Sequence, residues 1–211
     1  MLRLKIDGSW EPKEFIEVLQ AVENMYYKLV PSELPRLWLE EFYFGGAFSF
    51  DRYTDTSIPY PFVLDLTNQR LTERLRYTAP GALRLKVRAI QYASPGGIDL
   101  LGVGKVLEVI CDSIGRMKVY WDDAHLRKER DKQASLDTKI KETKLEQERE
   151  ILKDLKLKNA ETAIRLLDSF PRAPEALLPL LVRDQDILWD LIAEGKLIDV
   201  ELTGAERSSG R

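Results

Sequence analysis

Two clear apolar patterns open the chain. Residues 2–6 alternate between apolar and basic side chains, which predicts a half-buried β-strand. From Pro12 to Leu29 apolar residues recur at helical spacing, with polar residues on the opposite side. Pro12 suits the first turn of a helix, where its missing N–H has no intrahelical partner to lose. The pattern therefore predicts an amphipathic helix that ends before Pro31.

The stretch 31–82 has no clean period and is rich in proline and aromatic residues. It predicts a short helix near 33–42, an irregular aromatic loop after it, an extended piece at 62–66 and a weak helix at 68–77. Three interpretations of the aromatic residues stay open: packing in the core, an exposed protein-binding surface, or a stacking platform for a ligand. The second interpretation makes candidate interface residues of Trp38, Phe42 and Phe44.

A second strand is predicted over residues 83–92, where apolar and basic residues alternate until the pattern slips by one at Ile90. A β-bulge, or burial of both faces near the strand end, explains such a slip. A turn at 94–97 follows, and then a helix from about Asp99 to Ile114. Strands and helices in this order predict an α+β head over residues 1–121, with helices on one face of a small sheet.

The composition changes in the segment 122–170. More than half of the residues from His125 to Lys158 are charged, and neither proline nor glycine interrupts the segment. Such a run predicts a long solvated helix, since the heptad pattern of a coiled coil is poor. A helix of this length extends roughly 50 Å, so it either reaches a partner or folds back on the head.

Apolar residues return in the segment 171–203, ahead of a polar tail at 204–211. The pattern predicts a helix at 176–182, a second helix capped by Asp184, and a short strand at 197–202. These helices hold more apolar surface than a short hairpin can bury alone, which favours a docking surface and self-association. The candidate interface residues there are Leu180, Ile187, Leu188 and Leu191.

Overall composition argues against several classes of function. The 211 residues include 32 basic and 35 acidic side chains, so a net charge of −3 gives no support to nucleic-acid binding. The single cysteine, Cys111, allows neither an internal disulfide nor a cysteine-rich zinc site. The single histidine, His125, lies in the polar helix, away from any plausible catalytic partner. We therefore predict no catalytic residues, no metal ligands and no cofactor.

The N-terminus lacks the apolar core of a signal peptide, and no stretch of about 18 apolar residues is present. A cytoplasmic protein is the resulting expectation.

One segment resembles a phosphate-binding loop in its glycine content and in its expected place between a strand and a helix. Its candidate ligand-binding residues are Ser94, Gly96, Gly97, Gly102, Gly104 and Lys105. A P-loop, however, requires glycine where Asp99 stands, and serine or threonine where Val106 stands. The favoured interpretation is a tight turn whose glycines let neighbouring elements approach closely.

Together these patterns favour a non-catalytic protein–protein interaction or assembly module that self-associates through its helical segments. The expected partner is another protein or a second copy, not a membrane. The alternative is a small-ligand or nucleotide sensor, or an enzyme, that uses the glycine-rich segment 94–105.

Overall fold

The computed structural model describes residues 1–30, 72–73, 76–77, 79–133, 138–165 and 177–203. Within these residues the chain forms an α+β fold of four long helices and one antiparallel sheet of four strands. The elements, in order, are β1 (Leu2–Ile6), α1 (Pro12–Leu29), the 3-10 turn η3 (Gly81–Leu83), β2 (Lys86–Gln91), β3 (Gly96–Leu101), α4 (Gly104–Gln133), α5 (Thr138–Arg165), α6 (Leu177–Ala193) and β4 (Leu197–Leu202).

Several expectations for the stretch 31–82 fall outside the described residues. These are the helix at 33–42, the extended piece at 62–66 and the aromatic residues Trp38, Phe42 and Phe44. Of the helix expected at 68–77, residues 72–73 and 76–77 are described, and they are helical.

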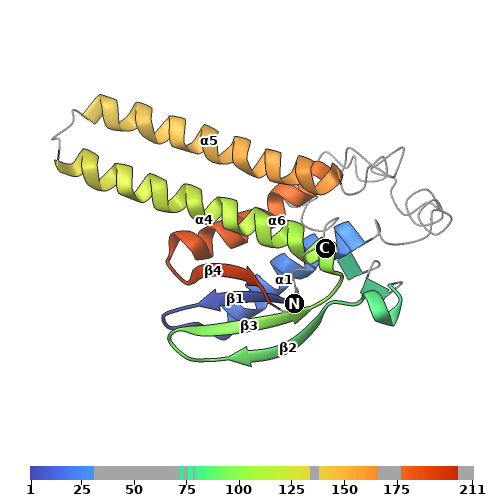
Figure 1. The fold of residues 1–211 in the computed structure, drawn as a ribbon. Helices are drawn as coiled ribbons and strands as arrows, with labels where there is room; N and C mark the ends of the chain where they lie inside the picture. The colour runs from blue at the N-terminus through green and yellow to red at the C-terminus, as the bar shows by residue number, and fades with distance from the viewer. Residues whose placement is uncertain (31–71, 74–75, 78, 134–137, 166–176, 204–211) are drawn as a thin grey trace, which may run out of the picture.

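The sheet has the strand order β2-β3-β1-β4, and every neighbouring pair is antiparallel. The helices cover one face of it, as predicted (Figure 1). In β1 the alternation read from the sequence is confirmed, because Leu2, Leu4 and Ile6 are buried beneath the helices. The other face carries charged side chains that form cross-strand ion pairs. Arg3 holds Asp99 with two hydrogen bonds of 2.6 and 2.8 Å, and Lys5 lies 2.8 Å from Glu201.

The helix predicted to begin at Asp99 is wrong in its first turn, because residues 96–101 form the strand β3. This strand is hydrogen-bonded on both sides, with Leu100 opposite Leu2 of β1 and Val87 of β2. Ile98 and Leu100 face the helices, whereas Asp99 faces Arg3 on the outer side. The helical pattern applies only from Gly104, where α4 begins.

Strand β2 contains the predicted β-bulge, which lies between Val87 and Ala89. The bulge places Val87 opposite Leu100 and Ile90 opposite Ile98, so both side chains point to the helix-covered face. The alternative, burial of both faces, is wrong. All six residues of β2 are exposed because the strand forms an edge of the sheet.

Helix α1 begins and ends where the sequence indicates, with Pro12 at its first position and its last residue two before Pro31. Its N-terminus is capped: the N–H of Glu11 donates to the Glu14 carboxylate over 2.8 Å. The C-terminal prediction needs one correction. Asp184 does not cap a second helix, because α6 runs without interruption from Leu177 to Ala193.

The helical character predicted for the charged segment is confirmed within the described residues, but the expectation of one continuous helix is wrong. The segment lies in two helices, α4 and α5, which we call the arm. They run antiparallel, and their far ends extend beyond the sheet (Figure 1). Hydrogen bonds tie the two helices together: Tyr120 donates to the Glu148 carbonyl over 3.0 Å, and Asn159 donates to the Ser113 carbonyl over 3.3 Å. The charged run therefore folds back on itself, and part of it also packs on the head.

Candidate functional site

The glycine-rich segment is divided by a strand. Gly96 and Gly97 begin β3, whereas Gly102 and Gly104 follow its end, so the two pairs lie roughly 20 Å apart. Ser94 lies in the turn before β3, where its hydroxyl donates to the Asp7 carboxylate. Lys105 is exposed in the first turn of α4. The structure thus does not gather these six residues into one loop, and ligand binding by them stays a prediction.

Gly102 has a packing role at the point where α4 leaves the sheet. A Cβ at this position would lie 2.6 Å from the ring of Tyr26. The Tyr26 hydroxyl accepts a hydrogen bond from the N–H of Val103 over 2.9 Å and donates to the carbonyl of Leu83 over 2.7 Å. Glycine is therefore required here so that α1 can hold the start of α4 closely.

The C-terminal residues predicted as an interface lie inside the chain's own core. Leu180 and Leu188 are fully buried and Leu191 nearly so, while Ile187 is half-buried. Helix α6 packs against α1, α4 and α5, which cover the apolar surface that suggested docking. These leucines are consequently not available to a partner unless the core opens.

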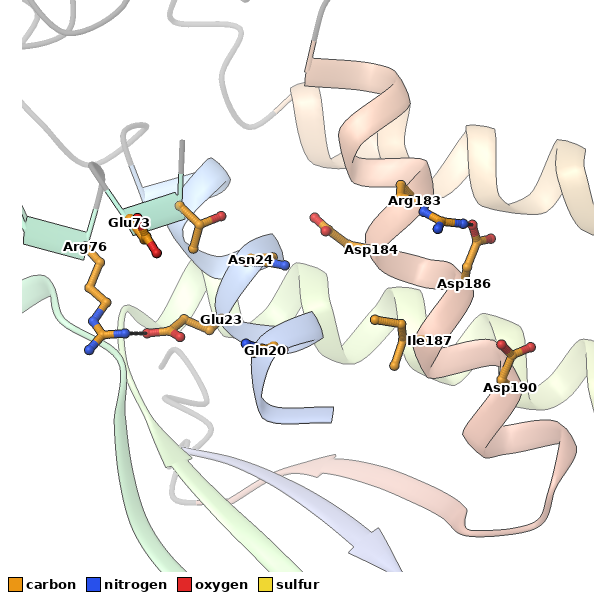
Figure 2. Close-up of a pocket in the computed structure, with 11 residues that line it drawn as sticks. Gln20, Glu23, Asn24, Glu73, Arg76, Arg183, Asp184, Asp186, Ile187 and Asp190 are labelled. Atoms are coloured by element: carbon orange, nitrogen blue, oxygen red, sulfur yellow. Dashed lines mark hydrogen bonds and ion pairs between the residues drawn. The ribbon is translucent and has the colours of Figure 1, made fainter. Parts of the chain in front are cut away.

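A polar pocket lies between α1 and α6, with a volume of about 440 Å³. Figure 2 shows Gln20, Glu23 and Asn24 of α1 on one side and Asp184, Ile187 and Asp190 of α6 across from them. The remaining lining residues are Thr72, Glu73, Arg76, Arg183 and Asp186.

Burial perturbs two of the pocket carboxyl groups. Glu23 lies 3.6 Å from Arg76, yet burial raises its pKa above the usual value, with Arg76 opposing the shift. Burial also raises the pKa of Asp190, and nearby Asp186 and Glu194 add to the shift while Lys156 opposes it. Both groups therefore hold a proton more readily than a fully hydrated carboxyl group does, although Asp190 remains partly open to solvent.

Beside the pocket, Lys28 of α1 and Asp184 of α6 form an ion pair in which both side chains are buried. The ammonium also donates to the Asn24 carbonyl over 3.3 Å. Burial lowers the pKa of Lys28, and Asp184 opposes that shift. We call this contact the joint, because it links the first helix to the last.

The basic groups at the pocket are largely matched to its acids. Asp186 binds Lys156 at 2.6 Å and Arg183 at 3.4 Å. The Thr72 hydroxyl is buried and has no hydrogen-bond partner among the residues that the structure describes. The pocket can offer acceptors to a small amine or guanidinium group, but its lining contains no nucleophile paired with a base. Within the described part of the chain, no group of three or more His, Cys, Asp or Glu side chains is arranged to hold a metal ion.

Sequence reasoning missed the joint and the pocket because their residues lie far apart along the chain. The hydrogen bond between Lys28 and Asp184 spans 156 positions. Only one partner gave a signal: Lys28 stands between apolar residues near the end of α1, whereas Asp184 lies in a short polar stretch between two apolar runs of α6. A charge at a core position indicates a buried partner.

The arm carries the second candidate surface. Val119, Leu126 and Ile151 are 63%, 56% and 50% exposed, on helices whose other exposed residues are mostly charged or polar. Beside them an open groove of about 510 Å³ runs between α4, α5 and β4. It is lined by Cys111, Asp112, Gly115, Arg116, Val119, Tyr120, Leu155 and Val200. Burial raises the pKa of the Cys111 thiol, which disfavours the reactive thiolate.

Among the described helices, none has an apolar stretch long enough to cross a membrane. The chain matches no known protein-family model, no curated protein and no solved structure. The geometry of the chain itself is therefore the basis for assigning a function.

Proposed function

We propose that this protein is a non-catalytic interaction or assembly module whose contact element is the arm. The observation that carries the proposal is the set of exposed apolar residues on α4 and α5, beside the open groove. Apolar side chains on an otherwise charged helical hairpin contribute little to the chain's own core. They gain most when a partner covers them.

The contrast with the pocket supports this choice. Most pocket charges are bound by neighbouring charges of the chain itself, as in Glu23–Arg76 and Asp186–Lys156. The C-terminal leucines are likewise covered by the chain's own helices. On the arm, Val119, Leu126 and Ile151 stay exposed. The far ends of α4 and α5 extend beyond the sheet, where a partner can reach them (Figure 1).

Site-specific photo-crosslinking tests the proposal. A photoreactive amino acid would replace Leu126 on the arm or, as the matched control, exposed Lys13 on α1. Irradiation of cells that produce the protein should give a discrete adduct of higher mass from position 126 and none from position 13. The same adduct from both positions, or no adduct from position 126, would contradict the proposal.

A further inference from the structure

Four charged residues form a line along the outer face of α4. Lys105, Asp112, Arg116 and Asp123 follow one another at intervals of seven, four and seven residues. At about 100° of rotation per residue, these intervals keep all four side chains within roughly 20° of one line on the helix surface. All four are exposed, and none forms an ion pair with any residue of the described chain.

The order of the signs is the informative feature. From the N-terminal end the line is positive, negative, positive, negative, and Ile114 stands at its midpoint. Lys105 and Asp123 are equally distant from Ile114 in sequence, and so are Asp112 and Arg116. If a second copy of α4 packs antiparallel to the first, with the two Ile114 residues at the same height, every positive group therefore faces a negative one. The result is two Lys105–Asp123 pairs and two Asp112–Arg116 pairs between the helices.

The surface beside this line is suited to close contact. Val119 and Leu126 are exposed next to it, on the same side of the helix as Gly115. A Cβ placed on Gly115 would meet no atom of another described element within 4 Å, so the space beside that residue is open in the described part of the chain. The apolar groove lies along the same flank. The four charges can thus fix how two helices align, and the neighbouring apolar side chains can be buried between them.

We propose that two copies of this chain associate through the outer faces of α4, antiparallel and related by a twofold axis at the level of Ile114. The inference rests on the proposed function and names its partner, a second copy. Such an interface is isologous, because the same patch of each chain meets its own copy. A partner of one dominant charge would be attracted by half of the line and repelled by the other half, whereas the chain itself matches all four positions.

Charge reversal tests the pairing through the molar mass measured by light scattering. The wild-type chain should approach twice 24.3 kDa as its concentration rises. Asp112→Arg and Arg116→Asp should each remain near 24.3 kDa, because each creates two like-charged pairs across the axis. A mixture of the two variants should return to the doubled mass, and so should the double reversal in one chain. Lys13→Glu on α1 is the control that should dimerise as the wild type does.

A second measurement requires no substitution. Lys105 and Asp123 lie about 27 Å apart along a single α4, so a zero-length carbodiimide can join them only between two chains. We expect a product of doubled mass whose digest contains a peptide linking these two residues. That result supports the interface even if a reversed variant fails to fold, which circular dichroism would reveal.

Three results would overturn the inference: wild-type protein that keeps the mass of one chain at every concentration, single reversals that dimerise normally, or a carbodiimide product that lacks this linkage. Photo-crosslinking separates its failure from that of the proposed function. An adduct from position 126 whose mass is not that of two chains would leave the arm as a contact element and reject the second copy as its partner.

Discussion

The joint links α1 to α6, and the arm consists of α4 and α5. The two regions distribute charge and apolar surface in opposite ways. At the joint, Lys28 and Asp184 are buried among apolar residues and neutralise each other. On the arm, the charges are hydrated, and Val119, Leu126 and Ile151 are exposed beside them. The difference indicates a division of labour. The joint fixes the helices of the head to one another, whereas the arm offers a surface that the fold does not itself require.

The largest expected effect comes from breaking the joint. Lys28→Ala leaves the Asp184 carboxylate buried without its ammonium partner, and the free energy of unfolding should fall by about 3–5 kcal/mol in a urea titration. The matched change on the arm, Leu126→Ala, removes an exposed side chain and should cost less than about 0.5 kcal/mol. Similar losses from the two variants would contradict the contrast between the joint and the arm.

The double variant Lys28→Met with Asp184→Leu sharpens this test. It removes both charges and retains apolar volume, so it should recover most of the stability that the single variant loses. A double variant as unstable as Lys28→Ala would mean that Asp184 stabilises the fold through contacts other than the ammonium.

An intermediate effect is expected where the arm joins the head. Gly102→Ala forces a Cβ against the Tyr26 ring and should lower the free energy of unfolding by about 1–3 kcal/mol. At Gly104 a Cβ would meet nothing within 4 Å, so Gly104→Ala serves as the matched control and should be close to neutral or slightly stabilising. Equal stabilities of the two variants, measured by thermal unfolding, would argue against the packing role of Gly102.

The smallest expected effect on stability comes from the ion pair between Arg3 and Asp99, on the face of the sheet away from the helices. The hydrogen bond from Arg3, assisted by its charge, lowers the pKa of Asp99 below 3.8. A carboxyl group whose pKa is lower in the folded state than in the unfolded state stabilises the fold at pH values above its unfolded pKa. This stabilisation is lost as the pH falls through the folded-state pKa. Arg3→Met should therefore reduce the loss of stability on acidification below about pH 4. Urea midpoints at neutral and acid pH would measure this, and identical acid sensitivity of both proteins would contradict it.

Local periodicity was sufficient to predict β1, α1, β4 and the helical character of the charged segment. In each case the apolar pattern of the element matched the environment it has in the fold. The sequence misplaced the boundary at β3, because the spacing of Leu100 and Val103 also fits a helix. Residues 96–101 form a strand because they hydrogen-bond to β1 on one side and to β2 on the other, and the pairing with β1 is not local in sequence.

The candidate sites were harder to predict for a related reason. The value of Leu180 and Leu188 as interface residues depends on what covers them, and the α1 and α5 surfaces that do so are distant in sequence. The glycine-rich segment appeared continuous in the sequence, but Gly96 and Gly97 begin the strand β3 and Gly102 follows its other end. Sequence alone does contain the alternating charges of α4. Their significance depends on the observation that this face is exposed and that its charges lack partners within the described chain.

The pairing of β1 with β4 has a consequence for biosynthesis. Leu2 lies opposite Leu202, so the sheet cannot close until about 200 further residues have been made and have left the ribosome. At usual translation rates that delay is on the order of 10–40 s. Throughout this interval β1 lacks one of its two neighbouring strands, and Lys28 lacks Asp184. The nascent chain should therefore depend on chaperones until β4 has been made, although the local contacts of the helical hairpin can form well before then.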